Sequence, residues 1–559
     1  MRAFTQSVWQ SLWQSHRQTK RLINVFSYQK DAAAARKASS QNNKAEAGSN
    51  GSKNQDPNND EEVKKPYKTP QLVGLILGPL LFMLTLFFFQ PDGLSFEGKA
   101  VLAVTLWVAT WWITEAMPIP ATSLLPIILL PLTGALDSGT VTSAYGNDII
   151  FLFLGGFFIA TAMEKWNLHK RLALGIIALI GTSTQRILLG FMVATGFLSM
   201  WVSNTAAVMM MIPMGLAITA QVASALKGKP EEKELPKFEK ALIFGIGYAG
   251  TIGGLGTLIG TPPNIILAAQ VNELFGVEIS FALWMLFAAP VVAILLVFTW
   301  LYLGRFAFKM TIKGLPGGQE VITKERKSLG KMSFEEKAVL TVFIITAFMW
   351  VTRELIWTRI FTDLDLKDGM IAMAATAALF LMPASKKFGS RILEWKDSRD
   401  IPWGVLLLFG GGLAIAAGFT SSGLSDWMGE QLQVLDGMHI FLVIVATTLL
   451  IMGMTEITSN TATATMIMPI VAALALAINI HPYAVMIPSA LAANCAFMLP
   501  VGTPPNAIIF GTGKLKIIEM VRVGFIVNII ATVLIIAAVY LLLPVLWGID
   551  LTIFPESFR

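Results

Sequence analysis

Cysteine and histidine are scarce in this 559-residue chain. Cys495 is the only cysteine, and the four histidines lie far apart at no spacing typical of metal ligands. One cysteine excludes a disulfide framework or a thiolate metal site within a single chain. The sequence also has no Ser/His/Asp constellation, Walker loop or dinucleotide-binding glycine motif in a credible context. These absences argue against an ATP-driven pump and against a membrane enzyme, because nothing would hold phosphates or supply catalytic groups.

Charge is equally sparse. Only 14% of the residues are charged and 54% are apolar, whereas soluble domains carry about 25% charged residues. Apolar runs of about 20 residues, long enough to cross a bilayer, recur along the chain, and Leu72–Gln90 and Phe281–Leu303 are the cleanest. The chain is therefore expected to be an integral membrane protein.

We expect an all-α polytopic membrane protein with about eleven transmembrane helices. They lie near residues 71–90, 99–116, 118–135, 147–164, 241–270, 281–304, 336–353, 369–384, 402–419, 484–512 and 517–547. Two further apolar stretches, 187–224 and 439–478, are each about twice the length of a span, and a polar Ser-Asn-Thr interrupts each one. A polar break at mid-membrane depth predicts a re-entrant hairpin, since such backbone is tolerated where it lines a cavity.

The first 66 residues have a different composition. Met1–Lys30 contains no acidic residue and places apolar side chains at helical spacing, which fits a basic amphipathic helix on a membrane surface or a transit peptide. Residues 31–66 have the composition of a disordered linker. We expect residues 1–66 to form a dispensable cytoplasmic tail.

Basic residues concentrate in loops on one side of the predicted topology. These loops include Lys227–Lys240, Arg305–Lys337, Lys386–Arg399 and Lys514–Arg522. Because positively charged loops stay in the cytoplasm, the N-terminus is expected there, and an odd number of spans places the C-terminus outside. The expected location is the cell's inner (plasma) membrane, crossed many times.

Three motifs occur twice, in the same order. Gly-Gly, Ser-Asn-Thr and Thr-Pro-Pro-Asn begin at Gly155, Ser203 and Thr261, and again at Gly410, Ser459 and Thr503. Ser-Asn-Thr follows the Gly-Gly by 48 residues in the first set and by 49 in the second. Four predicted spans lie between the two Gly-Gly spans, so the two halves start on opposite faces of the membrane. This is an inverted-topology repeat, which is frequent in secondary transporters, although channels are also built from such repeats.

The repeat predicts the domain organisation. After a lead helix at 71–90, the first repeat covers 99–304, with hairpin 187–224 and a broken helix at 241–270. The second repeat covers 336–547, with hairpin 439–478 and a broken helix at 484–512.

Thr-Pro-Pro-Asn cannot continue a helix. Proline lacks the amide donor and forces the preceding residue out of the α region. We therefore expect an unwound turn with free carbonyls that suit sodium, followed by a helix N-terminus that suits an anion. Ser-Asn-Thr adds hydroxyls and an amide without charge, so Asn204 and Asn460 can donate to a carboxylate while their oxygens face a cation. A proline kink and helix-packing hydroxyls are the simpler explanations of a single copy.

One segment carries a family resemblance. Trp112–Thr122, with the sequence WITEAMPIPAT, looks like the signature of the divalent anion:sodium symporters, and both pairs of motifs match that family. The similarity covers roughly residues 70–547. It implies a scaffold domain, a mobile transport domain that moves by an elevator-type alternating-access mechanism, and a homodimer.

The resemblance also implies the function and the site residues. The function is sodium-coupled uptake of C4 dicarboxylates such as succinate, fumarate or malate, with sodium ions co-transported. The residues of this chain that resemble the family's first sodium site are Ser199, Ser203, Asn204 and Gly260. Those that resemble its second sodium site are Thr455, Thr458, Asn460 and Gly502. The side chains that resemble the family's substrate-binding residues are those of Asn204, Thr205, Asn460 and Thr461. Thr261, Pro262, Thr503 and Pro504 are expected nearby. Membrane lipid is also an expected partner, and no nucleic acid is expected.

Several points stay open at the level of sequence. A tricarboxylate (citrate) or sulfate symporter, a sodium-independent dicarboxylate exchanger and a channel remain alternatives. Thr458 and Gly502 replace the small apolar residues expected there, but these positions contribute backbone carbonyls. Glu115 and Glu456 are carboxylates in apolar surroundings, where an ionisable group is functional by default. We favour a role in supporting the structure or a sodium site over a proton relay.

Overall fold

The computed structural model describes residues 67–181, 183–310, 318–360, 362, 364–384, 389–435 and 437–558. These residues form helices and loops without a strand, apart from one isolated bridge between Pro383 and Arg391. The predicted all-α fold is confirmed. The predicted cytoplasmic tail, residues 1–66, lies outside the described residues.

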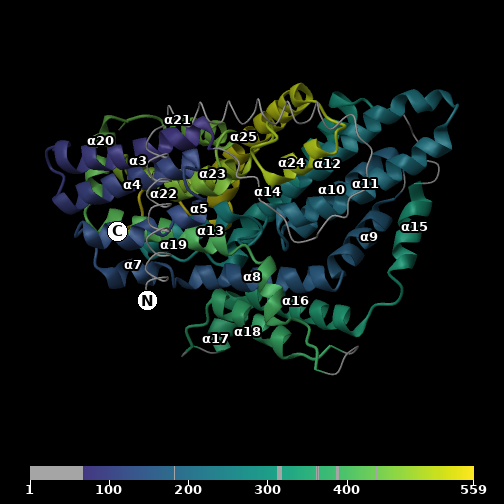
Figure 1. Ribbon diagram of the computed structural model, residues 1–559, viewed down its shortest axis with the longest axis horizontal. Coiled ribbons are helices and arrows are strands. Elements are labelled where there is room, and N and C mark those ends of the chain that lie inside the picture. Colours follow the sequence, from purple (N-terminus) through teal and green to yellow (C-terminus); the bar gives the residue numbers. More distant parts are fainter. Residues whose placement is uncertain are drawn as a thin grey trace, which may run out of the picture.

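The helices fall into two halves of the chain (Figure 1). A lead helix, α3 (Thr69–Phe88), precedes both. The first half comprises α4 (Phe96–Thr114), α5 (Ile119–Thr122), α6 (Leu125–Leu132), α7 (Ser138–Ala144), α8 (Asp148–Lys165), α9 (Leu168–Ile180), α10 (Thr184–Ser199), α11 (Asn204–Leu226), α12 (Leu235–Gly254), α13 (Pro262–Phe275) and α14 (Phe281–Leu301). Next along the chain comes α15 (Gly318–Ser328).

The second half comprises α16 (Phe334–Thr352), α17 (Thr358–Ile360), α18 (Asp368–Leu381), α19 (Trp403–Ser421), α20 (Leu424–Leu432), α21 (Ile440–Thr455), α22 (Asn460–Ala477), α23 (Tyr483–Asn494), α24 (Pro504–Gly511) and α25 (Ile517–Trp547). Each of the eleven predicted spans coincides with one helix or with a pair of consecutive helices. By length and hydropathy alone, eight helical segments of the described residues can cross a membrane. Two of these are the hairpin arms α11 and α22. Other predicted spans contain only shorter apolar helices, such as Ile119–Leu132, Asp368–Leu381 and Tyr483–Asn494.

The two halves pack in matching ways around their broken helices. Both α10 and α11 pack on α12, and both α21 and α22 pack on α23. The second arm of each broken helix then crosses to the other half, because α13 packs on α22 and α24 packs on α11. The turns that break the helices therefore lie where the two halves cross.

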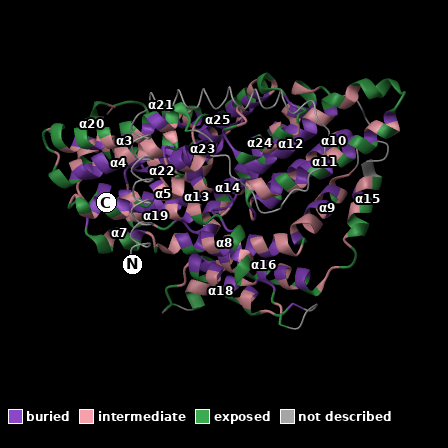
Figure 2. Cartoon of the chain, viewed as in Figure 1, coloured by how far each residue is buried: buried purple, intermediate pink, exposed green. Residues whose placement is uncertain are grey.

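Apolar side chains cover much of the outer surface. On α3, Ile76, Leu80, Phe87 and Phe88 are all exposed, and exposed positions lie along the outer helices in Figure 2. Exposed aliphatic and aromatic rows on helices of this length suit the hydrocarbon of a bilayer. The buried positions lie mainly in the interior, where the broken helices meet.

A buried arginine joins α16 and α18 to the rest of the bundle. The two helices lie on one side of α8 (Figure 1). Arg353 is 5% exposed and forms ion pairs with Asp368 at 3.1 Å and with Glu278, just before α14, at 2.8 Å. A buried charge needs such partners, since an unpaired one would be costly in free energy.

Candidate functional site

Both broken helices contain an unwound turn. Residues 255–261 separate α12 from α13, and residues 495–503 separate α23 from α24. Thr261 and Thr503, each before a proline, are extended with φ of −147° and −142°, as the steric clash with the following ring requires. Pro262 and Pro504 then begin the second arms, where a missing N–H costs nothing.

The two Ser-Asn-Thr motifs form the tips of the predicted hairpins. Four residues, 200–203, separate α10 from α11, and another four, 456–459, separate α21 from α22. The Ser203 hydroxyl accepts a hydrogen bond from Ala206 N at 3.2 Å and so caps α11. Ser459, the equivalent residue of the second tip, does not cap α22 with its side chain, and its neighbour Thr458 donates from Oγ1 to Met454 O at 2.7 Å.

At the first tip, a cluster of oxygen atoms surrounds Asn204. Ser199 is fully buried and donates from Oγ to Gly250 O on α12 at 2.5 Å. The Asn204 amide is best satisfied with its nitrogen toward Ser199 Oγ (2.5 Å), Gly260 O (3.2 Å) and Gly250 O (3.3 Å). A half-turn of this amide would present Oδ1 to a cation in the same place.

At the second tip, the arrangement is repeated with different residues. Thr455, also fully buried, places Oγ1 2.5 Å from Ala493 O on α23 and 2.6 Å from Asn460 Oδ1, so these two acceptors share its one hydroxyl proton. The Asn460 amide nitrogen donates to Asn494 O at 3.3 Å. Both clusters offer hydroxyl, amide and carbonyl oxygens only, and such oxygens are the ligands that hard cations prefer.

The last residue of each Thr-Pro-Pro-Asn motif holds its turn together. Asn264 Nδ2 donates to Gly254 O (3.1 Å), Leu255 O (3.1 Å) and Thr257 O (2.8 Å). Asn506 Nδ2 donates to Ala496 O and Leu499 O, both at 2.9 Å. These asparagines belong to the repeated motif, but the sequence pattern predicted no role for them. They satisfy carbonyls that lost their helical partners when the helix unwound.

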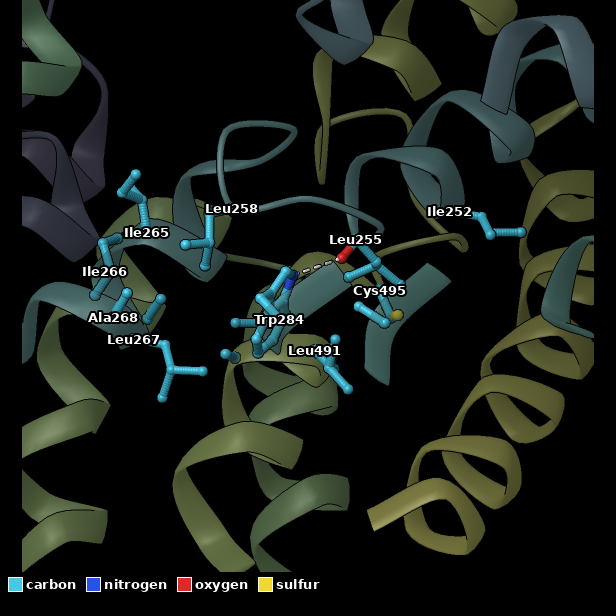
Figure 3. Close-up of a cluster of buried hydrophobic side chains, with 14 of the residues drawn as sticks. Ile252, Leu255, Leu258, Ile265, Ile266, Leu267, Ala268, Trp284, Leu491 and Cys495 are labelled. Atoms are coloured by element: carbon cyan, nitrogen blue, oxygen red, sulfur yellow. Dashed lines mark hydrogen bonds between the residues drawn. The ribbon is translucent and has the colours of Figure 1, made fainter. Parts of the chain in front are cut away.

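A tryptophan from α14 also fixes the first turn. Trp284 is fully buried, and its Nε1 donates to Leu255 O at 3.1 Å (Figure 3). The apolar cluster around it contains Ile252 and Leu258 from the first half and Leu491 from the second. The first turn is therefore packed against both repeats.

The two carboxylates singled out in the sequence have different surroundings. Glu456 is 2% exposed, and its carboxylate accepts hydrogen bonds from Phe497 N (2.9 Å), Met498 N (3.1 Å) and Leu499 N (3.2 Å). Asn528 Nδ2 on α25 donates to it as well, at 2.7 Å. Glu115, by contrast, is an exposed residue at the end of α4 with φ of +49°. Glu456 thus organises the second turn, whereas Glu115 lies at a helix end.

A cavity of about 860 Å³ lies between the two tips and the two turns, within the range typical of small-molecule sites. All eight predicted substrate residues line it: Asn204, Thr205, Thr261, Pro262, Asn460, Thr461, Thr503 and Pro504. Of the predicted sodium residues, Ser203, Gly260, Thr458 and Gly502 also line it, while Ser199 and Thr455 lie behind the two asparagines.

The charged residues of the cavity wall lie outside the three repeated motifs. Lys68, Glu115 and Glu164 lie at or next to the ends of α3, α4 and α8, and Asp400 ends the short 3-10 helix that precedes α19. Gln71 Nε2 donates to Glu115 O at 3.0 Å and joins two of these helix ends. Around the tips and turns, the cavity offers neutral polar groups and four helix N-termini, those of α11, α13, α22 and α24.

The chain resembles known transport proteins over nearly all of its described length. Residues 70–552 match the family model described as the sodium:sulfate symporter transmembrane region. The sodium-dependent dicarboxylate transporter SdcS of Staphylococcus saprophyticus is 58% identical over 496 residues, which cover 88% of this chain and 95% of SdcS. The SdcS of Staphylococcus aureus strain MRSA252 is 57% identical over 489 residues, covering 87% of this chain and 94% of that protein.

Two solved structures share the fold at low identity. Neisseria gonorrhoeae MtrF, described among antimetabolite efflux pumps, aligns with a TM-score of 0.50 and 12% identity, covering 84% of this chain and 94% of MtrF. The YdaH transporter of Alcanivorax borkumensis aligns with a TM-score of 0.50 and 14% identity, covering 86% of this chain and 98% of YdaH. At this identity the likeness concerns the fold alone.

Proposed function

The chain belongs to the sodium:sulfate symporter family, and we propose that it is a secondary active transporter that couples sodium to the uptake of C4 dicarboxylates. The observation that carries this proposal is the convergence of two oxygen clusters and four helix N-termini on one cavity. The oxygen clusters suit sodium, and the helix N-termini suit carboxylate groups.

A dianion fits the electrostatics of the cavity. Burying two negative charges without compensation would cost a great deal of free energy, and the motif residues supply no fixed positive charge. Two sodium ions next to Asn204 and Asn460 would balance a dicarboxylate, so substrate and cation favour each other's binding. The relatives at 57–58% identity carry the name of dicarboxylate transporters, which favours this substrate class over sulfate and citrate.

We further propose the orientation and the assembly. The basic loops favour a cytoplasmic N-terminus and an external C-terminus in the plasma membrane. On this orientation the helix ends at Lys68, Glu115, Glu164 and Asp400 face the cytoplasm, so the cavity wall they form belongs to an inward-facing state. An elevator movement of the two hairpins and broken helices, in a homodimer, would carry the site to the other face.

Uptake of labelled succinate by proteoliposomes tests the function. We expect an inward sodium gradient to drive accumulation, and choline or potassium in its place to abolish it. Accumulation of citrate or sulfate in place of succinate would reassign the substrate. Full activity without sodium that requires internal dicarboxylate would establish an exchanger and contradict the proposal.

A further inference from the structure

One buried asparagine outside the repeated motifs joins the two halves at the level of the cavity. Asn494 is the last residue of α23, lines the cavity and is 1% exposed. Its Nδ2 donates to Thr251 O on α12 at 2.8 Å, and its Oδ1 accepts from Thr261 Oγ1 at 2.7 Å. Both side-chain partners belong to the first repeat, 243 and 233 residues away in sequence.

The main chain of the same residue belongs to the second oxygen cluster. Asn494 O accepts from Asn460 Nδ2 at 3.3 Å, and the preceding carbonyl, Ala493 O, accepts from Thr455 Oγ1. Asn494 therefore presents its backbone to one cluster and its side chain to the other repeat.

The side-chain partners are the immediate neighbours of the first cluster. Thr251 follows Gly250, and Thr261 follows Gly260, and the carbonyls of these two glycines face the Asn204 amide. A cation that draws either glycine carbonyl inward would shift the adjacent threonine. Through its hydrogen bonds, that threonine would shift Asn494 and the carbonyls of the second cluster.

The link is made by only one of the two equivalent threonines. Thr261 Oγ1 does not cap its own helix and donates across to Asn494. Thr503, at the same place in the second motif, accepts from Asn506 N at 3.3 Å and caps α24. The hydroxyls of Thr261 and Thr503 are therefore a matched pair: the first forms a hydrogen bond between the two repeats, and the second caps its own helix.

We propose that Asn494 is a positioning residue that couples the two cation sites, so that binding of the first sodium ion prepares the second site. The inference rests on the proposed sodium-coupled function and adds to it a residue that carries cooperativity. Coupling between sites is reciprocal and typically changes affinity about 5- to 150-fold.

The test measures succinate uptake against sodium concentration in proteoliposomes. For the unchanged protein we expect a sigmoidal curve. Asn494→Ala and Thr261→Val should each flatten it toward a hyperbola and raise the half-saturating sodium concentration by about fivefold or more. Thr261→Ser keeps the hydroxyl and should restore the sigmoidal shape.

Thr503→Val is the matched control. It also removes a hydroxyl from the cavity wall and should lower uptake, but it should leave the sigmoidal shape intact. Combining Asn494→Ala with Thr261→Val should have no larger effect on cooperativity than Asn494→Ala alone, because Asn494→Ala already removes both side-chain hydrogen bonds of the link, including the one from Thr261. Since Thr261→Val is nearly isosteric, it decides the question if Asn494→Ala does not fold.

The outcomes separate this inference from the proposed function. Absence of sodium dependence in the unchanged protein would contradict the function itself. Sodium-dependent uptake that is hyperbolic in the unchanged protein, or that remains sigmoidal in Asn494→Ala or Thr261→Val, would overturn the coupling role alone. Equal flattening in Thr503→Val would also overturn it.

Discussion

Ser199 and Thr455 make the same contact in the two halves of the protein. Each lies five residues before the asparagine of its hairpin tip, and each hydroxyl donates at 2.5 Å to a carbonyl on the first arm of its broken helix, Gly250 O or Ala493 O. The two hydroxyls are fully buried. Each one therefore joins a hairpin to a broken helix just behind the cavity.

From this contact we predict a loss of sodium affinity in Ser199→Ala and Thr455→Ala. Each change removes a buried hydrogen bond worth about 1 kcal/mol and one candidate sodium ligand. The half-saturating sodium concentration for succinate uptake should rise several-fold. Thr455→Ser retains the hydroxyl and is the control; unchanged sodium dependence in both alanine variants would remove these residues from the sites.

Asn204→Ala and Asn460→Ala should each abolish transport in a folded protein. Both amides lie between an oxygen cluster and the cavity, so in the proposed function each would serve sodium and substrate together. Losing a hydrogen bond to a charged group costs about 1.5–3 kcal/mol. The measurement is succinate uptake by proteoliposomes, with size-exclusion profiles as the control for folding. Near-normal uptake by both variants would contradict the assignment of these residues to the site.

The two glycines of the turns should differ in their tolerance of alanine. A Cβ on Gly260 would collide with the backbone oxygen of Gly254, whereas a Cβ on Gly502 would lie 3.2 Å from the Ala496 Cβ. Gly260→Ala must displace main chain and should lose uptake and stability. Gly502→Ala should keep most of both. Melting temperature and uptake measured side by side decide the point, and the reverse order would contradict the geometry.

Replacing Glu456 should first of all lower the stability of the folded protein. Glu456→Ala would leave three backbone N–H groups, those of residues 497–499, without this acceptor. The first is buried and the other two are partly buried, and a buried donor without a partner costs about 1–3 kcal/mol. We expect a marked fall in melting temperature and in yield of folded protein. Glu115→Ala, at an exposed helix end, is the control and should melt normally; a normal melting temperature for Glu456→Ala would refute the capping role.

His481 should make the folded state sensitive to acid. Burial lowers the pKa of His481 to about 4, and its neutral Nδ1 accepts from Tyr483 N at 3.2 Å. A histidine whose pKa is depressed on folding stabilises the protein above its usual pKa of about 6.5, and that contribution is lost as the pH falls toward 4.

The measurement is the melting temperature of purified protein between pH 7.5 and pH 5. It should fall with pH in the unchanged protein and fall less in His481→Asn, whose side-chain oxygen accepts the same bond without titrating. Parallel curves for the two proteins would exclude His481 as the source.

The sequence alone determined the membrane class, the helix positions, the repeat and the family. Spans follow from the length and apolarity of local runs, and the broken helices follow from proline and glycine, whose effects act on neighbouring residues. The six motifs, repeated in the same order, also contain residues that come to line one cavity, including Asn204, Thr261, Asn460 and Thr503.

Only the tertiary structure decided which polar residues meet. Asn494 looks like one polar residue in an apolar run, and its partners Thr251 and Thr261 are more than 230 residues away. Glu115 and Glu456 are both carboxylates in apolar sequence surroundings, yet of the two only Glu456 is buried. Its carboxylate accepts from backbone N–H groups that lie 41 residues or more further along the chain than Glu456 itself. Such pairings depend on how the second arm of each broken helix crosses into the other half, and no local pattern of residues encodes that crossing.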